Sequence, residues 1–324
     1  MQEMMLARAK ALLQSGDVQR VLGWQTGEFV YDVTPAAFET AEELDAKFVY
    51  NDFCGSNLSK YLVKESRKEG RVLVFLKPCD TYSFNQLIKE HRIARENIYV
   101  IGVPCAGKTD GETLKALGLK GILGVKDAGD SFTLETLYGE KTVSKQEALP
   151  ERCRSCKSHK HMVYDELLGE EGEVLDSHRF DMVEKIESMS ADERFAFWQG
   201  ELSRCIRCNA CRNVCPACTC EKCVFDNENS GIAQKAAADS FEESMFHIIR
   251  AFHVAGRCTD CGECSRVCPQ NIPLHLLNRK FIKDINTFYG AYQAGEDTES
   301  RAPLTNYTKG DAEPSIVYHK GGEK

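Results

Sequence analysis

Short apolar runs alternate with helical stretches in the first half of the chain. Three runs have the length and composition of buried strands: 71–76, 97–103 and 121–125. Residues 80–93 and 111–118, which lie between these runs, have a helical pattern. Because strands that alternate with helices build layered sheets, we expect an α/β domain with a mostly parallel sheet over residues 1–175.

The second half of the chain has a helical pattern instead. Residues 240–256 place apolar side chains at helical spacing, namely Phe241, Met245, Ile248, Ile249 and Phe252. Residues 273–290 open with a proline in a first-turn position and are expected to be helical as well. We therefore expect a helical domain over residues 176–290, followed by an extended polar tail over residues 291–324.

The composition is that of an ordinary globular protein. The chain has 324 residues, of which 42% are hydrophobic and 28% are charged, so it is long enough for two domains with separate cores. A net charge of −8 argues against a nucleic-acid partner, since binding to phosphates depends on Lys and Arg. The start of the chain lacks the features of a secretory signal, and no apolar run approaches the roughly 20 residues that span a bilayer. We expect a cytoplasmic protein without a membrane span, in which disulfides would be rare.

The chain contains sixteen cysteines, and half of them form two copies of one motif. Each copy has the pattern C-x2-C-x2-C-x3-C-P; its cysteines are Cys205, Cys208, Cys211 and Cys215 in the first copy, and Cys258, Cys261, Cys264 and Cys268 in the second. Zinc sites usually take cysteines in pairs. Three cysteines at two-residue gaps instead offer thiolates to three irons of one cluster, and the fourth cysteine binds the neighbouring cluster. The motif therefore predicts two [4Fe–4S] clusters.

This exchange of the fourth cysteine assigns the ligands of each cluster. We expect one cluster to take Cys205, Cys208, Cys211 and Cys268, and the other to take Cys258, Cys261, Cys264 and Cys215. The neighbouring His247 and His253 either pack on a helix or serve the clusters as ligands or proton carriers. Four nearby arginines either raise the reduction potentials of the clusters or lie on a solvated surface: Arg204, Arg207, Arg212 and Arg266. With its two helices, this half resembles the α-helical ferredoxins of heterodisulfide reductase and succinate dehydrogenase iron–sulfur subunits.

Four more cysteines lie where the first half would place a site. Cys79 follows the first apolar run in FLKPCD, and Cys105 follows the second in IGVPCAG. Loops at the carboxyl ends of parallel strands are where such folds bind ligands. Cys153 and Cys156 form a close pair in CRSC, which would also suit zinc, and single buried thiols remain an alternative for the other two. Together the four are expected to hold a third [4Fe–4S] cluster, with Cys54 as a substitute ligand.

The run KPCDTYSFNQLIKEHRIARENIYVIGVPCAGKTDGETLKALG, followed by ERCRSCKSHKHMVYDELLGE, resembles the β-subunit family of deazaflavin (F420)-reducing hydrogenases and formate dehydrogenases. Members of this family carry a Pro-Cys turn after one strand, a second cysteine after the next strand, and a later C-x2-C. The segment CIRCNACRNVCPACTC is also similar to the iron–sulfur subunits of sulfhydrogenase and anaerobic sulfite reductase. In this chain the ferredoxin-type motifs lie C-terminal to the β-subunit-like domain, and GSNLSKYL replaces the Gly-Gly loop of the members that bind flavin.

The resemblance implies an electron-transfer subunit of a multi-subunit anaerobic oxidoreductase, such as a hydrogenase, a formate dehydrogenase or a heterodisulfide-reductase-like complex. Its [4Fe–4S] clusters would relay single electrons between other redox subunits, and we expect no catalytic residues in a pure relay. The alternative is a subunit that binds FAD and itself exchanges electrons with NAD(P)H, ferredoxin or a deazaflavin. The family leaves the terminal electron donor and acceptor open.

Two features of the sequence keep further alternatives open. Cys218, Cys220 and Cys223 are either plain thiols or, with Cys54, the ligands of a fourth cluster. Residues 102–109, GVPCAGKT, fit the letters of a nucleotide-binding P-loop after a strand. Pro104 lacks the amide N–H that such a loop would use, so we interpret this stretch as a cluster-ligand loop.

Overall fold

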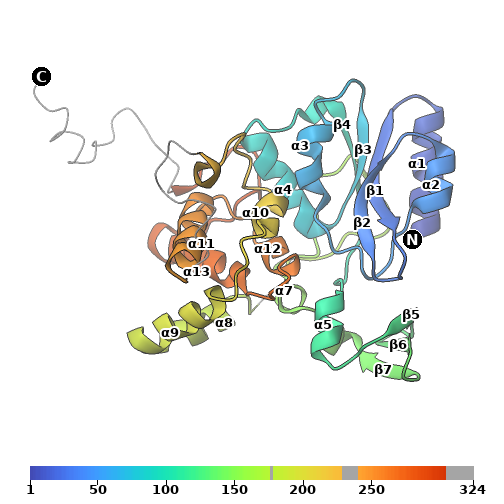
Figure 1. Cartoon of the computed structure of the whole chain (residues 1–324). Helices are drawn as coiled ribbons and strands as arrows, with labels where there is room; N and C mark the ends of the chain where they lie inside the picture. Colours follow the sequence, from blue (N-terminus) through green and yellow to red (C-terminus); the bar gives the residue numbers. More distant parts are fainter. Residues whose placement is uncertain (176–177, 228–239, 304–324) are drawn as a thin grey trace, which may run out of the picture.

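The computed structural model describes residues 1–175, 178–227 and 240–303 of the chain. Figure 1 shows an α/β part formed by the first half of the chain beside a helical part formed by the second half. The expected fold class is thereby confirmed. Most of the predicted polar tail, residues 304–324, lies outside the described residues. No helix in the described ranges is long and apolar enough to cross a bilayer.

The main sheet has five strands in the order β2-β1-β3-β4-β8. Four of them run parallel: β1 (Arg20–Thr26), β3 (Val72–Leu76), β4 (Ile98–Gly102) and β8 (Glu166–Leu167). The edge strand β2 (Val33–Phe38) pairs antiparallel with β1. The expected strands at 71–76 and 97–103 are therefore confirmed as β3 and β4, which lie side by side in register from Val72 opposite Ile98.

Helices cover the main sheet on both faces, which explains why β3 is a continuous apolar run whose five residues are all fully buried. Figure 1 shows α1 (Gln2–Gln14) and α2 (Ala41–Lys47) on one side of the sheet, and α3 (Leu62–Glu65) and α4 (Pro78–Lys89) on the other. The prediction of a helix at 80–93 is confirmed, although α4 begins two residues earlier. Proline suits the first turn of a helix because its missing N–H has no partner there.

The third apolar run does not join the parallel sheet. It becomes β5 (Ile122–Asp127) of a separate antiparallel sheet with β6 (Ser131–Thr136) and β7 (Lys141–Ser144). The connection from β5 to β6 is a tight turn at Asp127–Asp130, where Gly129 takes a φ of +82°. A parallel neighbour would have needed a long crossover instead. The short helices on either side of this sheet are α5 (Gly111–Ala116) and α6 (Lys145–Ala148).

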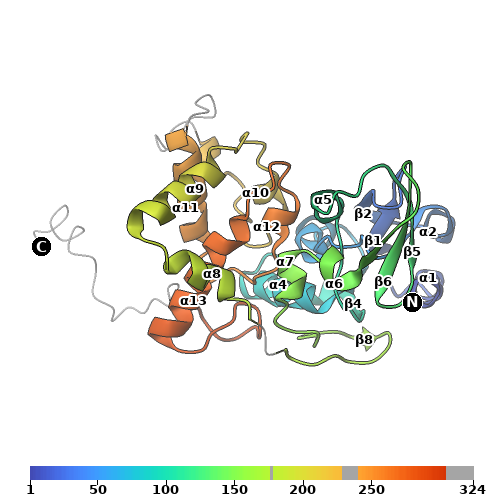
Figure 2. The same ribbon diagram turned by 90° about the horizontal axis from the view of Figure 1, so that it is seen from below.

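The second half of the chain is helical, as expected. Its helices are α8 (Asp181–Glu187), α9 (Ala191–Leu202), α10 (Ala210–Val214), α11 (Ser240–Val254), α12 (Glu263–Arg266) and α13 (Leu274–Tyr289). The short α7 (Glu151–Arg154) lies between the two parts (Figures 1 and 2). Single 3-10 turns complete the element order: Leu58–Tyr61, Arg95–Asn97 and Val224–Asp226.

Helix α11 has the expected position but buries an unexpected face. Phe241, Ile248 and Phe252, which the apolar spacing places on one stripe, are 68%, 43% and 62% exposed. The buried face combines apolar side chains, such as Phe246 and Val254, with polar ones, and His247 and Arg250 are only 2% and 4% exposed. The helix therefore turns its charged groups toward the cysteine motifs, a choice that hydrophobic periodicity does not reveal.

The two parts of the chain contact each other next to the cysteine motifs. The buried carboxylate of Glu263 in α12 accepts a hydrogen bond from the Asn57 backbone N–H at 3.1 Å and lies 3.3 Å from the Arg152 guanidinium. The Ser83 and Thr259 hydroxyls share a hydrogen bond of 2.8 Å. These buried polar contacts link α4 and α7 of the α/β part to the second cysteine motif.

Candidate iron–sulfur centres

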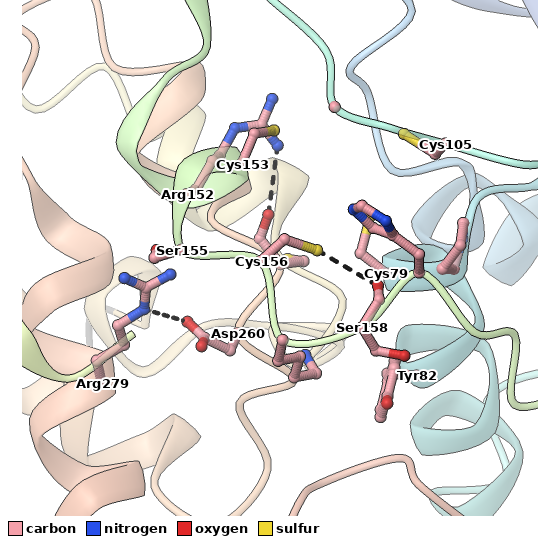
Figure 3. A pocket seen from close by; sticks show the side chains of 15 residues that line it. Cys79, Tyr82, Cys105, Arg152, Cys153, Ser155, Cys156, Ser158, Asp260 and Arg279 are labelled. Carbon is pink, nitrogen blue, oxygen red and sulfur yellow. Dashed lines mark hydrogen bonds and ion pairs between the residues drawn. The ribbon is translucent and has the colours of Figure 1, made fainter. Parts of the chain in front are cut away.

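The four cysteines expected at a third site line one cavity at the edge of the main sheet (Figure 3). Cys79 is the second residue of α4, directly after β3, and Cys105 lies in the loop after β4. Because β3 and β4 are parallel neighbours, their carboxyl ends bring these two thiols to the same edge. Cys153 in α7 and Cys156 just after it complete the set. Residues from three separate segments thus converge, as the sequence predicted.

A second cavity lies between the two motifs of the helical part. It is lined by Cys258, Cys261 and Cys264 of the second motif and by Cys215 of the first. Burial raises the pKa of the Cys261 and Cys264 thiols to about 12. Such thiols stay protonated until a bound metal ion replaces the proton, because metal ligation requires the thiolate form.

A third cavity has the complementary set of ligands. It is lined by Cys205, Cys208, Cys211 and, from the second motif, Cys268. The structure therefore groups the eight cysteines in the crossed arrangement expected of a two-cluster ferredoxin. The second and third cavities offer four thiols each, and the first offers Cys79, Cys105, Cys153 and Cys156 beside Cys261, which it shares with the second. Sets of four thiols fit a [4Fe–4S] cluster.

The backbone of both motifs follows the same unusual path. Arg207 and Asn209 flank Cys208 with left-handed φ values of 53° and 61°, and Asp260 and Gly262 flank Cys261 with values of 57° and 70°. Left-handed residues on either side of the middle cysteine curl the chain, so that successive thiols line one cavity. Non-glycine residues rarely adopt this conformation, and their occurrence at three of these four positions indicates a backbone shaped around a ligand.

Cys54 and Cys218, two of the cysteines considered for a fourth cluster, lie in different surroundings within the described part of the chain. Cys54 is fully buried in the hydrophobic core of the α/β part, where its sulfur accepts a hydrogen bond from the Asn51 N–H at 3.2 Å. None of the three cysteine-lined cavities contains it. Cys218 instead lies beside Cys215, and its hydrogen bond lowers the pKa of the Cys215 thiol to about 5. Lys60 holds the Cys218 carbonyl at 2.5 Å.

The P-loop-like stretch is engaged in packing rather than open to a phosphate. The Lys108 ammonium donates to the Asn51 carbonyl at 2.9 Å and lies over the Tyr50 ring. The Thr109 hydroxyl donates to the Ala148 carbonyl at 2.6 Å. Both side chains are therefore occupied within the protein, in agreement with the interpretation of this stretch as a cluster-ligand loop.

Of the two histidines near the motifs, one contacts a cysteine of the third cavity. The His247 ring nitrogen Nε2 lies 3.2 Å from the Cys205 sulfur, with Glu243 in the same group. Burial, with Arg250 and Arg207 nearby, lowers the pKa of His247 to about 3. The ring is therefore neutral, and its Nε2 can donate a hydrogen bond to the Cys205 sulfur once that thiol is deprotonated. His253, by contrast, is exposed.

The four arginines named from the sequence all pair with carboxylates. Arg266 contacts Glu263 at 2.6 Å and Arg212 contacts Asp226 at 2.7 Å. Arg207 and Arg204 pair with Glu243 and Glu201. Sequence reasoning passed over a fifth arginine, Arg250, which lies deeper than any of these. The sequence signal that could have identified Arg250 was its position three residues after His247 on the same helix, α11.

Comparison with known proteins supports iron–sulfur chemistry in the helical part of the chain. The model of the 4Fe-4S dicluster domain matches residues 201–272. The F420-dependent formate dehydrogenase subunit beta of Methanocaldococcus jannaschii is 26% identical, over 92% of this chain and 92% of its own length. The chain is similar to this β subunit over almost its whole length. It is an iron–sulfur electron-transfer protein with a ferredoxin-type dicluster module at its C-terminal end.

Two further proteins extend the comparison. The F420-dependent formate dehydrogenase 1 subunit beta of Methanococcus maripaludis is 24% identical over 91% of both chains. A chain of the F420-reducing [NiFe] hydrogenase complex from Methanosarcina barkeri is 14% identical with a TM-score of 0.38, covering 47% of this chain and 58% of that one. Both formate dehydrogenase β subunits are matched over more than nine tenths of their own length.

Proposed function

We propose that this chain is the β subunit of a formate dehydrogenase-type complex and relays single electrons along three [4Fe–4S] clusters. The ligands of the clusters would be the three sets of four cysteines described above, of which the two ferredoxin-type sets are crossed. Relatives of the same length are named as subunits of F420-dependent formate dehydrogenases, which supports a place in such a complex with other redox subunits as partners.

The observation that carries this proposal is that the three cavities are connected through shared residues and a shared helix. The cavity of Cys79 and Cys153 shares Asp260 and Cys261 with the cavity of the second motif. The short helix α10 connects that cavity to the next, because it carries Cys211 of the first-motif cavity and ends at Cys215, which lines the second-motif cavity. Electrons would therefore pass from the α/β part through the second-motif cluster to the first-motif cluster, or in reverse.

Charged side chains support cluster binding along this line. Arg152 lines the first cavity with a side chain only 8% exposed, and its guanidinium lies 3.4 Å from the Cys261 carbonyl. Lys157 is half-buried at the same cavity and donates to the Thr259 carbonyl at 2.5 Å. Buried cations offset the negative charge that four thiolates bring to each cluster.

A second candidate function is that of a flavin-containing subunit. A cavity of about 340 Å³ opens between α5, α7 and the helical part, and Arg152 lines both this cavity and that of the third cluster. Its volume lies in the range of ligand pockets. A reduced deazaflavin gives up a hydride, and a cluster accepts one electron at a time, so a flavin bound here would link the two.

The isolated subunit separates the two functions. Reduced deazaflavin is added anaerobically to the purified chain, whose flavin content has been measured by fluorescence after denaturation. A relay without flavin keeps its clusters oxidised until a partner subunit is added, whereas a flavin-containing subunit reduces them unaided. Cluster reduction by a flavin-free chain, or a chain that native mass spectrometry finds without partners in its own host, would contradict the relay proposal.

A further inference from the structure

Arg250 is a buried cation with few partners. Its side chain lies on the inner face of α11, and the residue is 4% exposed. One of its guanidinium nitrogens, Nη2, donates to the Cys211 carbonyl at 3.1 Å. Within the described residues its Nε has no hydrogen-bond partner. A buried charge needs compensation, so the groups around this guanidinium have to supply it.

Those groups are the sulfurs of both ferredoxin-type sites. The guanidinium donates to the Cys211 carbonyl at the first-motif cavity, and its side chain hydrogen-bonds the Cys264 thiol, which lines the second-motif cavity. Burial disfavours the charged form of Arg250, but the nearby thiolates outweigh this and raise its pKa. In return, its charge favours the thiolate forms of Cys211, Cys215 and Cys264, against the burial that raises the pKa of Cys211 and Cys264.

The other arginines near the motifs form ion pairs with carboxylates, and among the described residues Arg250 does not. Arg266 and Arg212 contact Glu263 and Asp226. In the part of the chain that the structure describes, Arg250 pairs with no carboxylate. Its full charge is therefore directed at the two cluster sites. The helix positions it there because α11 turns its polar face inward and leaves Phe241, Ile248 and Phe252 exposed.

We propose that Arg250 is a cation shared by the two clusters of the dicluster module and raises the reduction potentials of both. The proposal rests on the ligand sets put forward above. Each cluster gains one electron, and thus one negative charge, when its redox partner reduces it. A fixed positive charge nearby favours the reduced form of each cluster. No proton moves, since an arginine keeps its charge at all physiological pH values.

A shared cation has a consequence for electron flow. Because the guanidinium contacts both sites, its charge moves both potentials in the same direction and leaves their difference nearly unchanged. Electron transfer between the two clusters is then affected little. What changes is the potential at which the module as a whole exchanges electrons with its partners.

The test uses the full chain, purified anaerobically, in the variants Arg250→Gln and Arg250→Lys, with Arg204→Gln as the control. Arg204 also lies next to a cluster cysteine in the sequence, but its side chain is 44% exposed and pairs with Glu201. Iron content is measured first. Reduction of each cluster is then followed by electron paramagnetic resonance at controlled potential and at several pH values.

We expect Arg250→Gln to lower the ratio of reduced to oxidised cluster at a fixed potential by roughly tenfold or more at both dicluster sites, about 59 mV for a one-electron couple. The shift would be the same at every pH. Arg250→Lys would retain most of the wild-type potentials, and Arg204→Gln would change neither.

Unchanged potentials in Arg250→Gln at full iron content, or a shift at only one of the two sites, would overturn the proposal. Loss of iron from the Gln variant but not from the Lys variant supports it, because charge rather than shape then holds the clusters. Loss of iron from both variants refutes it. A wild-type chain without two dicluster signals would instead contradict the ligand sets. That result would refute the proposed function rather than the role of Arg250.

Discussion

Removal of Cys153 tests whether the α/β part holds a cluster. The thiol belongs to α7 and lines the cavity between α4 and the second motif (Figure 3). Three sets of four cysteine ligands correspond to about twelve irons per chain, since each cluster contains four. Cys153→Ala leaves the proposed third set with three thiols, because Cys261, which also lines this cavity, belongs to the second-motif set. We therefore expect about eight irons and the loss of roughly a third of the cluster absorbance.

Cys54→Ala is the matched control for this prediction. Cys54 lies in the hydrophobic core near the same site, is fully buried, and lines none of the three cavities. Its removal is expected to leave the iron content unchanged and to lower the free energy of unfolding by about 1–2 kcal/mol, because a small cavity replaces the sulfur. Iron and protein are quantified on the same anaerobic samples, and unfolding is followed in urea.

Each alternative leaves a distinct iron content. A Cys153→Ala variant that keeps about twelve irons refutes the third site, and so does a wild-type chain with about eight. If Cys54→Ala loses about four irons, then Cys54 is a ligand after all. About sixteen irons in the wild type would indicate a fourth cluster that uses Cys218, Cys220 and Cys223.

Three further predictions concern the helical part. Cys268→Ser is expected to damage the cluster of the first motif, with which it shares a cavity, and spectra in which only the second-motif cluster changes would contradict the crossed ligands. Glu263→Gln leaves Arg152 and Arg266 without their carboxylate and is expected to lower the free energy of unfolding in urea by about 3–5 kcal/mol. The control Glu193→Gln, at an exposed helix cap, should change it by less than about 1 kcal/mol. Oxidative removal of iron is expected to unfold the helical part first, seen as loss of helical circular dichroism and as proteolysis beyond residue 175 while the α/β core persists, because metal binding and folding are coupled there. Equal protease sensitivity of both parts after iron removal would refute that coupling.

The sequence alone determined most of the chemistry of this protein. The spacing of Cys205, Cys208 and Cys211 specifies a cubane cluster, because only a loop with two-residue gaps offers successive thiols to one small cube. The apolar runs that became β3 and β4 were recognisable for a similarly local reason, since a strand buried on both faces has to be apolar along its whole length. Local spacing and local hydrophobicity carry both signals.

Tertiary structure decided what local patterns leave open. The strand at 121–125 was recognisable, but its partners were not, because pairing depends on the tight turn that follows it and on where the chain returns. Cys54 and Cys79 look alike in sequence. One lies in the apolar core and the other lines a cavity, since the edge of the sheet brings only the second beside Cys105.

Helix α11 shows the limit of sequence reasoning most clearly. Its apolar spacing predicted a helix correctly, yet Phe241 and Phe252 face outward, while His247 and Arg250 are buried. Hydrophobic periodicity assumes that a buried face packs against other apolar side chains. Here the buried face meets the cysteines of both motifs, whose thiolates attract donors and cations. Only the three-dimensional arrangement of those cysteines, brought together from segments more than forty residues apart, placed His247 and Arg250 on the inner face beside the apolar Phe246.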